Sequence, residues 1–122
     1  MRNGKHLMID AYGCDREALW DVNIIRLMLL QVTKKIKLRP LSEDMIFCVD
    51  ETMTHKSETG ITGGIIFMES HFTFHSFPER NYFSADIYSC KGFKHLKVIE
   101  YITELFSAQE YDLTIIKRGK KL

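Results

Sequence analysis

The feature of this sequence that most constrains its fold is a strict alternation of apolar and polar side chains on both sides of residues 78–81. The apolar members are Phe72, Phe74, Phe83, Ala85 and Ile87. A two-residue period places such residues on one face of a β-strand. The quartet Pro78-Glu79-Arg80-Asn81 that separates the two runs is rich in turn formers. The sequence therefore predicts a hairpin with one apolar face.

Two other segments have the period of an amphipathic helix. The first follows Asp15, which can cap it, and ends at Lys34-Lys35; its apolar residues are Leu19, Val22, Ile25, Leu29 and Val32. The second covers approximately residues 93–106, with an inner stripe formed by Leu96, Ile99, Ile102 and Leu105. Each of these helices can cover part of one face of a sheet.

Apolar and β-compatible runs predict the remaining strands. They occupy residues 6–12, 45–53, 61–69 and 111–117, and the run at 61–69 is apolar enough to be buried on both faces. We summarise the order as β-α-β-β-β-α-β. This order predicts an α+β fold, a two-layer sandwich of a mainly antiparallel sheet with two helices on one face. Without repeats or linkers, the chain is expected to form a single domain over residues 1–122.

The second face of the predicted hairpin is too aromatic to leave in water as a contiguous patch. Its members are His71, His75, Phe77, Tyr82, Asp86, Tyr88 and Cys90. Since both helices are needed on the other face, a second copy of the sheet is the simplest cover. We therefore predict a homodimer in which the two sheets face each other (αββα), with the chemistry between them.

Charge and composition disfavour several classes of function. Seventeen basic and sixteen acidic residues give a net charge of +1, so no broad field favours nucleic acid or an anionic membrane. No apolar run reaches the ~20 residues of a membrane helix, and the first residues lack the apolar core of a signal peptide. These features predict a cytoplasmic protein.

Three cysteines, Cys14, Cys48 and Cys90, form no CxxC pair, and their odd number argues against a disulfide framework or a structural zinc site. We expect free thiols, with Cys14 and Cys48 in the core. His71 and His75 could ligate a metal together with Asp86 or Cys90, but zinc sites usually show a clearer set of ligands. We predict no metal.

The segment Gly60-Ile61-Thr62-Gly63-Gly64, followed by ESHFTFHSFPE at residues 69–79, resembles the processing and active-site region of bacterial S-adenosylmethionine decarboxylases. Similar family features flank it in Gly4-Lys5-His6-Leu7, Tyr12-Gly13-Cys14 and Asp86-Ile87-Tyr88-Ser89-Cys90. The resemblance extends from about His6 to the last helix. An ESH tripeptide alone would be weak, but this longer pattern with a cysteine downstream is specific.

The resemblance implies that the chain is a precursor that cuts itself between residues 69 and 70. The Ser70 hydroxyl would attack the carbonyl of Glu69 and convert the peptide bond into an ester. Loss of the Ser70 α-proton would then release a dehydroalanine, which hydrolyses to a pyruvoyl group. By the same resemblance, His75 removes the proton and the Thr62 hydroxyl supports the oxyanion step. Gly63-Gly64 would allow the close approach of the backbone.

The cofactor implied by the resemblance is the pyruvoyl group made from Ser70, without a metal or pyridoxal phosphate. Its ketone would form a Schiff base with the substrate amine and accept electrons as carbon dioxide leaves. Cys90 corresponds to the family cysteine that returns a proton to the substrate. Among the substrate-binding residues, Glu79 corresponds to a carboxylate that binds ribose hydroxyls. Phe77 provides an aromatic face, and Glu69 lies at the new chain end.

The substrate implied by the resemblance is S-adenosylmethionine, whose decarboxylated form is the aminopropyl donor for spermidine and polyamine biosynthesis. The loop at residues 54–59 departs from the family because it lacks an aromatic residue to stack on adenine and contains Lys56. Some relatives with similar processing residues decarboxylate arginine or ornithine instead. A pyruvoyl-dependent decarboxylase for one of these amino acids is therefore an alternative, and a non-catalytic nucleoside-binding homologue is another.

Overall fold

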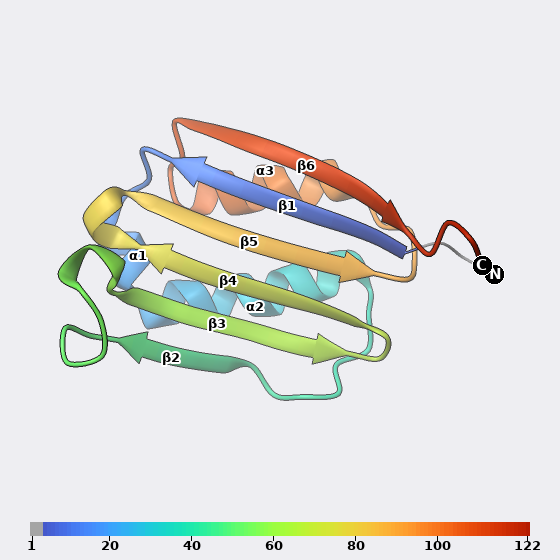
Figure 1. Cartoon of the computed structure of the whole chain (residues 1–122), viewed down its shortest axis with the longest axis horizontal. Helices are drawn as coiled ribbons and strands as arrows, with labels where there is room; N and C mark the ends of the chain where they lie inside the picture. Colours follow the sequence, from blue (N-terminus) through green and yellow to red (C-terminus); the bar gives the residue numbers. More distant parts are fainter. Residues whose placement is uncertain (1–3) are drawn as a thin grey trace.

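A computed structural model describes residues 4–122 and arranges them as one antiparallel sheet covered by helices (Figure 1). The strands lie in the order β2-β3-β4-β5-β1-β6. The elements are β1 (Gly4–Tyr12), α1 (Arg16–Trp20), α2 (Val22–Ile36), β2 (Met45–Val49), η1 (Lys56–Glu58), β3 (Gly60–Phe67), β4 (Ser70–Phe77), η2 (Pro78–Arg80), β5 (Tyr82–Ser89), α3 (His95–Leu105) and β6 (Glu110–Arg118).

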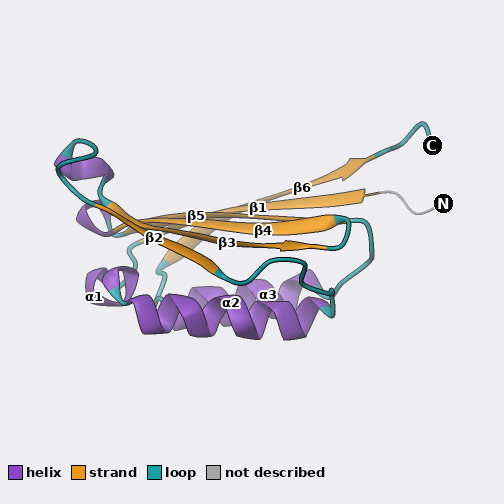
Figure 2. Ribbon diagram, turned by 90° about the horizontal axis from the view of Figure 1, so that it is seen from below, coloured by secondary structure: helices purple, strands orange, loops and turns teal. Residues whose placement is uncertain are grey.

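The α+β sandwich predicted from the sequence is confirmed, with all three α-helices on one face of the sheet (Figure 2). The summarised order gave three strands between the helices, but the predicted segments at 45–53 and 61–69 and the two runs of the hairpin make four, as in the structure. The chain reverses at Met68-Glu69, so that residues 60–67 and 70–77 form two strands of a hairpin. Among the described residues, no helix is long and apolar enough to cross a membrane.

The predicted first helix is in fact two helices, because an aspartate begins each one. The Asp15 side chain accepts a hydrogen bond from the Glu17 backbone N–H at the start of α1. The Asp21 side chain does the same for the N–H groups of Asn23 and Ile24 at the start of α2. Such caps satisfy backbone donors that lack a partner within the helix.

The core lies between the helices and the apolar face of the sheet. The alternation predicted for the β4–β5 hairpin is confirmed, since Phe72, Phe74, Phe83, Ala85 and Ile87 are all buried. The Phe74 ring is 5.2 Å from that of Phe83 and 5.4 Å from that of Phe106, centroid to centroid. The predicted stripe of α3 was wrong at Leu96, which is 67% exposed. Val98, Ile99 and Ile102 are the buried residues of that helix.

Three smaller predictions about burial and strand length were also wrong. Cys48 is exposed because it lies on β2, at the edge of the sheet. That strand ends at Val49 rather than residue 53, since Asp50 begins a turn by accepting a hydrogen bond from the Thr52 N–H. In β3, Ile66 is 43% exposed, so this strand is not buried on both faces. Cys14 is buried as predicted.

Candidate functional site

The sheet face opposite the helices, which we call the open face, carries most of the residues singled out in the sequence. Strands β4 and β5 pair without a bulge from His71↔Tyr88 to Phe77↔Tyr82. The predicted assignment of their side chains to the two faces of the sheet is therefore confirmed. The half-buried residues of these two strands that point to this face are His71, Thr73, His75, Phe77, Tyr82, Ser84, Asp86 and Tyr88. They form rows with His6, Met8 and Asp10 of β1.

The peptide bond between Glu69 and Ser70 lies at the tip of the β3–β4 hairpin. Phe67 pairs with Ser70, which leaves a two-residue turn, and Glu69 has φ 71°. This is the left-handed region, which costs a residue other than glycine about 1–2 kcal/mol. Favoured two-residue hairpin turns have a positive φ at their first central residue, whereas here only the second has one. The turn therefore holds the predicted scissile bond in an unfavourable backbone conformation.

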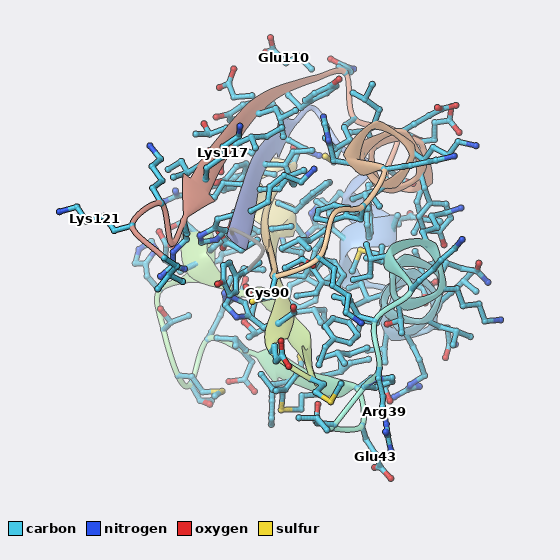
Figure 3. All side chains as sticks on the ribbon, turned by 90° about the vertical axis from the view of Figure 1, so that its right-hand side faces the viewer. Arg39, Glu43, Cys90, Glu110, Lys117 and Lys121 are labelled. Carbon is cyan, nitrogen blue, oxygen red and sulfur yellow. The ribbon has the colours of Figure 1, made fainter. Side chains whose placement is uncertain are left out.

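Cys90 contacts both residues of this bond. Its thiol lies 3.2 Å from the Glu69 carbonyl oxygen and donates to it. Its backbone N–H donates to the Ser70 hydroxyl oxygen at 3.3 Å. Figure 3 looks onto this end of the sheet, where Cys90 lies at the point at which the chain leaves β5. Ser70 is only 7% exposed, so its hydroxyl is largely shielded from water.

Tyr88 lies beside this cysteine, two residues earlier on the same side of β5. Its hydroxyl is 3.4 Å from the Cys90 sulfur, and the Arg118 guanidinium lies 4.8 Å from its ring centre. The hydrogen bond with Cys90, followed by burial, raises the pKa of Tyr88, so the phenol stays protonated and can donate. The sequence analysis gave Tyr88 no chemical role. The two-residue spacing from Cys90 was the available signal.

His75 and Thr62 form a second group, which lies away from the first. The Thr62 hydroxyl is 3.0 Å from His75 Nδ1, and the two residues are paired across β3 and β4. His75 is five residues further along β4 than Ser70, which corresponds to about 16 Å in an extended strand. The structure therefore brings together Thr62 and His75, and separately Glu69, Ser70 and Cys90, but it does not bring the two groups together within one chain.

The predicted substrate-binding residues Phe77 and Glu79 lie still further along, at the opposite end of β4 from Ser70 (Figure 1). The ring of Phe77 stacks on Tyr82 at 5.4 Å, and Tyr82 stacks on Tyr12 at the same distance. Glu79 pairs with Arg16. The hydrogen bond from Arg16 lowers the pKa of Glu79, so the carboxylate is charged at neutral pH.

A histidine cluster near the Ser70 end of the open face was missed in the sequence analysis. His6 Nε2 lies 3.2 Å from the Asp86 carboxylate, and the rings of His6 and His71 are 6.2 Å apart. Burial, and then the neighbouring His6, lower the pKa of His71, an effect that Asp86 partly opposes. The cluster depends on the pairing of β1 with β5, which local sequence does not indicate.

The glycines of β3 allow close backbone approach, as predicted at Gly64. A Cβ atom there would lie 2.8 Å from the Phe72 carbonyl oxygen. The need for glycine is stricter at Gly60, where a Cβ atom would lie 1.9 Å from the Ser76 carbonyl oxygen. Within residues 4–122, no three His, Cys, Asp or Glu side chains are grouped so as to hold a metal ion. The metal-site alternative therefore gains no support from this geometry.

The antiparallel sheet with one helical layer defines a two-layer α+β protein, and a serine–cysteine contact lies beside the strained hairpin turn at one end of the sheet. A family model described as S-adenosylmethionine decarboxylase matches residues 5–119. The chain therefore belongs to the S-adenosylmethionine decarboxylase family.

Similar curated proteins carry the name S-adenosylmethionine decarboxylase proenzyme. One from Pyrococcus horikoshii is 33% identical over 118 residues, which is 95% of this chain and 78% of that protein. Another, from Geobacillus kaustophilus, is 29% identical over 97% of this chain and 89% of that protein. The crystal structure of adenosylmethionine decarboxylase from Aquifex aeolicus superposes with a TM-score of 0.80 and 24% identity, covering 97% of this chain and 92% of that one. This last likeness concerns the fold.

Proposed function

We propose that this chain is the precursor of a decarboxylase that acts on S-adenosylmethionine, and that it cuts itself between Glu69 and Ser70. The observation that carries the proposal is the pair of contacts made by Cys90, whose thiol donates to the Glu69 carbonyl while its N–H holds the Ser70 hydroxyl. Membership in a family whose members are named proenzymes supports the same reading.

The first step is attack of Ser70 Oγ on the Glu69 carbonyl carbon. The carbonyl oxygen gains negative charge as the new C–O bond forms, and the Cys90 thiol is placed to stabilise it. The hydroxyl proton passes to the departing amide nitrogen, which leaves an ester and a free amine at residue 70. The positive φ at Glu69 favours this step, because breaking the amide releases the turn.

The second step removes the α-proton of residue 70 and so eliminates the Glu69 carboxylate. Water then replaces the nitrogen, which departs as ammonia, and the pyruvoyl group remains. That group supplies the electron-accepting carbonyl needed for decarboxylation, without a metal or pyridoxal phosphate. A cavity of about 360 Å³ beside Cys90 is bounded by Glu69, Tyr88 and Lys91 and leaves room for the substrate. Cys90 then returns a proton to the substrate carbon.

His75 is the base that the family resemblance assigns to the α-proton, yet it lies about 16 Å along β4 from Ser70. A homodimer resolves this separation. When two open faces meet around a two-fold axis that is parallel to the sheets and perpendicular to the strands, the His75 end of each sheet lies over the Ser70 end of the other. We therefore propose a homodimer in which the partner chain supplies His75 and Thr62 to each Glu69–Ser70 bond.

Intact-mass spectrometry of the purified chain tests processing directly. We expect two fragments, residues 1–69 and 70–122, with a summed mass that reflects the exchange of ammonia for water. Replacing the nucleophile in Ser70→Ala should leave one uncut chain. A wild-type chain that keeps its full mass under all conditions would reject the proposal.

Carbon dioxide release separates the candidate substrates. Carboxyl-labelled S-adenosylmethionine, arginine and ornithine are supplied in turn to the processed protein, and we expect release from S-adenosylmethionine alone. Release from arginine or ornithine instead would contradict the proposed substrate. A cut chain that binds S-adenosylmethionine without releasing carbon dioxide would favour the non-catalytic alternative.

Mixed dimers test whether His75 acts on the partner chain. Ser70→Ala and His75→Ala chains, uncut when expressed alone, are coexpressed with tags of different mass. We expect the His75→Ala chain to be cut in the mixture, since it keeps its own serine and receives the histidine of the other chain. If His75 acted only within its own chain, neither would be cut.

A further inference from the structure

The structure contains a second cavity, which shares only Lys91 with the one beside Cys90 and whose walls are strongly basic. It lies where the end of α2 meets the segment that enters α3 and has a volume of about 490 Å³. The cavity beside Cys90 has about 360 Å³. Five lysines and no acidic residue line it, together with Ile36, Gly92 and Phe93; the lysines are Lys35, Lys37, Lys91, Lys94 and Lys97.

The lining of this cavity, which we call the lysine cavity, contains no acidic residue, although Glu100 and Glu104 share a neighbouring pocket with Lys35 and Lys97. In the part of the chain that the structure describes, none of these lysines forms an ion pair. This concentration is local, because the whole chain carries a net charge of only +1. Like charges held around one cavity repel each other, so an anion that entered it would gain attraction and relieve that repulsion.

The helix that borders the cavity adds to the positive potential. Lys94 is the N-cap of α3 and makes no side-chain capping hydrogen bond, and the first turn contains no acidic residue. The N-terminus of a helix carries a partial positive charge, where lysines are unfavourable and anions are favourable. Lys91, Lys94 and Lys97 all lie near this end. The five lysines and the orientation of the helix therefore favour the same sign of ligand.

Contacts with Lys5 hold in place Phe93, one of the residues that line the lysine cavity. The Lys5 ammonium donates to the Phe93 carbonyl oxygen at 3.3 Å and lies 4.5 Å from the centre of the Phe93 ring. Ile36 is buried, and Lys35 lies over the Tyr101 ring at 5.1 Å. The cavity thus combines a fixed apolar floor with long side chains that can turn their ammonium groups toward a ligand.

We propose that the lysine cavity binds a polyphosphate chain, either free or as the phosphate tail of a nucleotide. A single phosphate group carries a charge of about −1.5 to −2, which five lysines exceed, whereas two or three linked phosphates match them better. Lysine suits such a ligand as an adaptable point charge, without the fixed geometry of an arginine fork. An isolated, half-open basic pocket on a nearly neutral chain disfavours nucleic acid, which is bound by extended basic surfaces.

Isothermal titration calorimetry on the full chain tests this proposal independently of processing and decarboxylation. The probes are inorganic tripolyphosphate and ATP, with adenosine as the uncharged control, all at the same ionic strength. We expect saturable binding of both phosphate probes that persists in excess adenosine, which would fill the nucleoside site of the proposed function without supplying phosphate. Equal affinities would identify the free polyphosphate as sufficient, while tighter binding of ATP would identify a nucleotide.

Matched double variants locate the site. Lys94→Gln/Lys97→Gln should weaken tripolyphosphate binding at least tenfold, whereas Lys120→Gln/Lys121→Gln should leave it unchanged. The second pair removes the same charge from the tail, and Figure 3 shows Lys121 on the side of the sheet away from the helices. Thermal melting should show that both variants remain folded. Absence of saturable binding by the wild type, or equal affinities in the two variants, would overturn the proposal.

Discussion

At the scale of single residues, the chemistry converges on Cys90. Its backbone and side chain contact the two groups that react in the proposed cleavage, and Tyr88 contacts its sulfur. A thiol can donate a hydrogen bond and can also give up its proton to a carbanion. The same residue can therefore support the oxyanion during processing and act as a proton donor afterwards.

Removing the Tyr88 hydroxyl should slow processing without changing the fold. In Tyr88→Phe the Cys90 thiol loses a hydrogen-bond partner that fixes its direction, so we expect cleavage to slow about fivefold, as for the loss of a ~1 kcal/mol hydrogen bond. Time-resolved intact-mass spectrometry measures the rate. Tyr101→Phe is the matched control, since its buried hydroxyl has no partner. Equal rates in the two variants would remove Tyr88 from the mechanism.

The three thiols should differ in reactivity because their surroundings differ. Burial raises the pKa of Cys14 to about 11, so at pH 8 this thiol is almost entirely protonated as well as enclosed. A thiolate is the reactive form, so Cys14 should stay unlabelled by iodoacetamide while the exposed Cys48 reacts first. Peptide mapping after short labelling checks the order, and unfolding the protein should make all three react. Early labelling of Cys14 in the folded state would contradict it.

At the scale of elements, the sequence correctly predicted those features that depend on the local pattern of apolar and polar side chains. The alternation at Phe72–Phe74 and Phe83–Ile87 fixed which face of the hairpin is buried, because period two admits only two choices. Leu96 was misassigned because both it and Val98 fit a helical stripe, and the packing of α3 against the sheet decides between them. The contact between Cys90 and Glu69 joins residues 21 positions apart, which only the paired strands bring together.

The turn at Met68-Glu69 should be strained in the precursor. Glycine adopts positive φ freely, so Glu69→Gly in an uncut Ser70→Ala background should raise the free energy of unfolding by about 1 kcal/mol. Chemical denaturation of the two uncut proteins measures the difference. Glu79→Gly in the same background is the control, because Glu79 is not among the residues with positive φ and glycine gives no such relief there. A destabilised Glu69→Gly protein would show that the turn is not under strain.

At the scale of the whole molecule, the open face links the fold to the chemistry. Helices cover only one side of the sheet (Figure 2), while the other side presents rings and ionisable groups along its length. Ser70 and His75 lie at different positions along the same strand, so one sheet alone does not bring these two proposed catalytic residues together. Pairing two open faces would bury the aromatic residues and also join the two parts of the proposed site. The exposed aromatic face and the divided site would then have the same explanation.

A charge placed in the middle of the open face should therefore abolish assembly and processing together. Thr73 lies there, paired with Gly64 and Asp86, and has been assigned no chemical role. Burying a guanidinium between two sheets is costly even beside the Asp86 carboxylate, because the loss of hydration can exceed the gain from the ion pair, whereas in a monomer the same side chain reaches water. Thr73→Arg should thus give a folded, uncut monomer by light scattering and intact mass. Leu27→Arg adds the same charge on α2, where Leu27 is 45% exposed, and should remain dimeric and cut. A monomeric Thr73→Arg chain that still cut itself would show that each chain carries its own base.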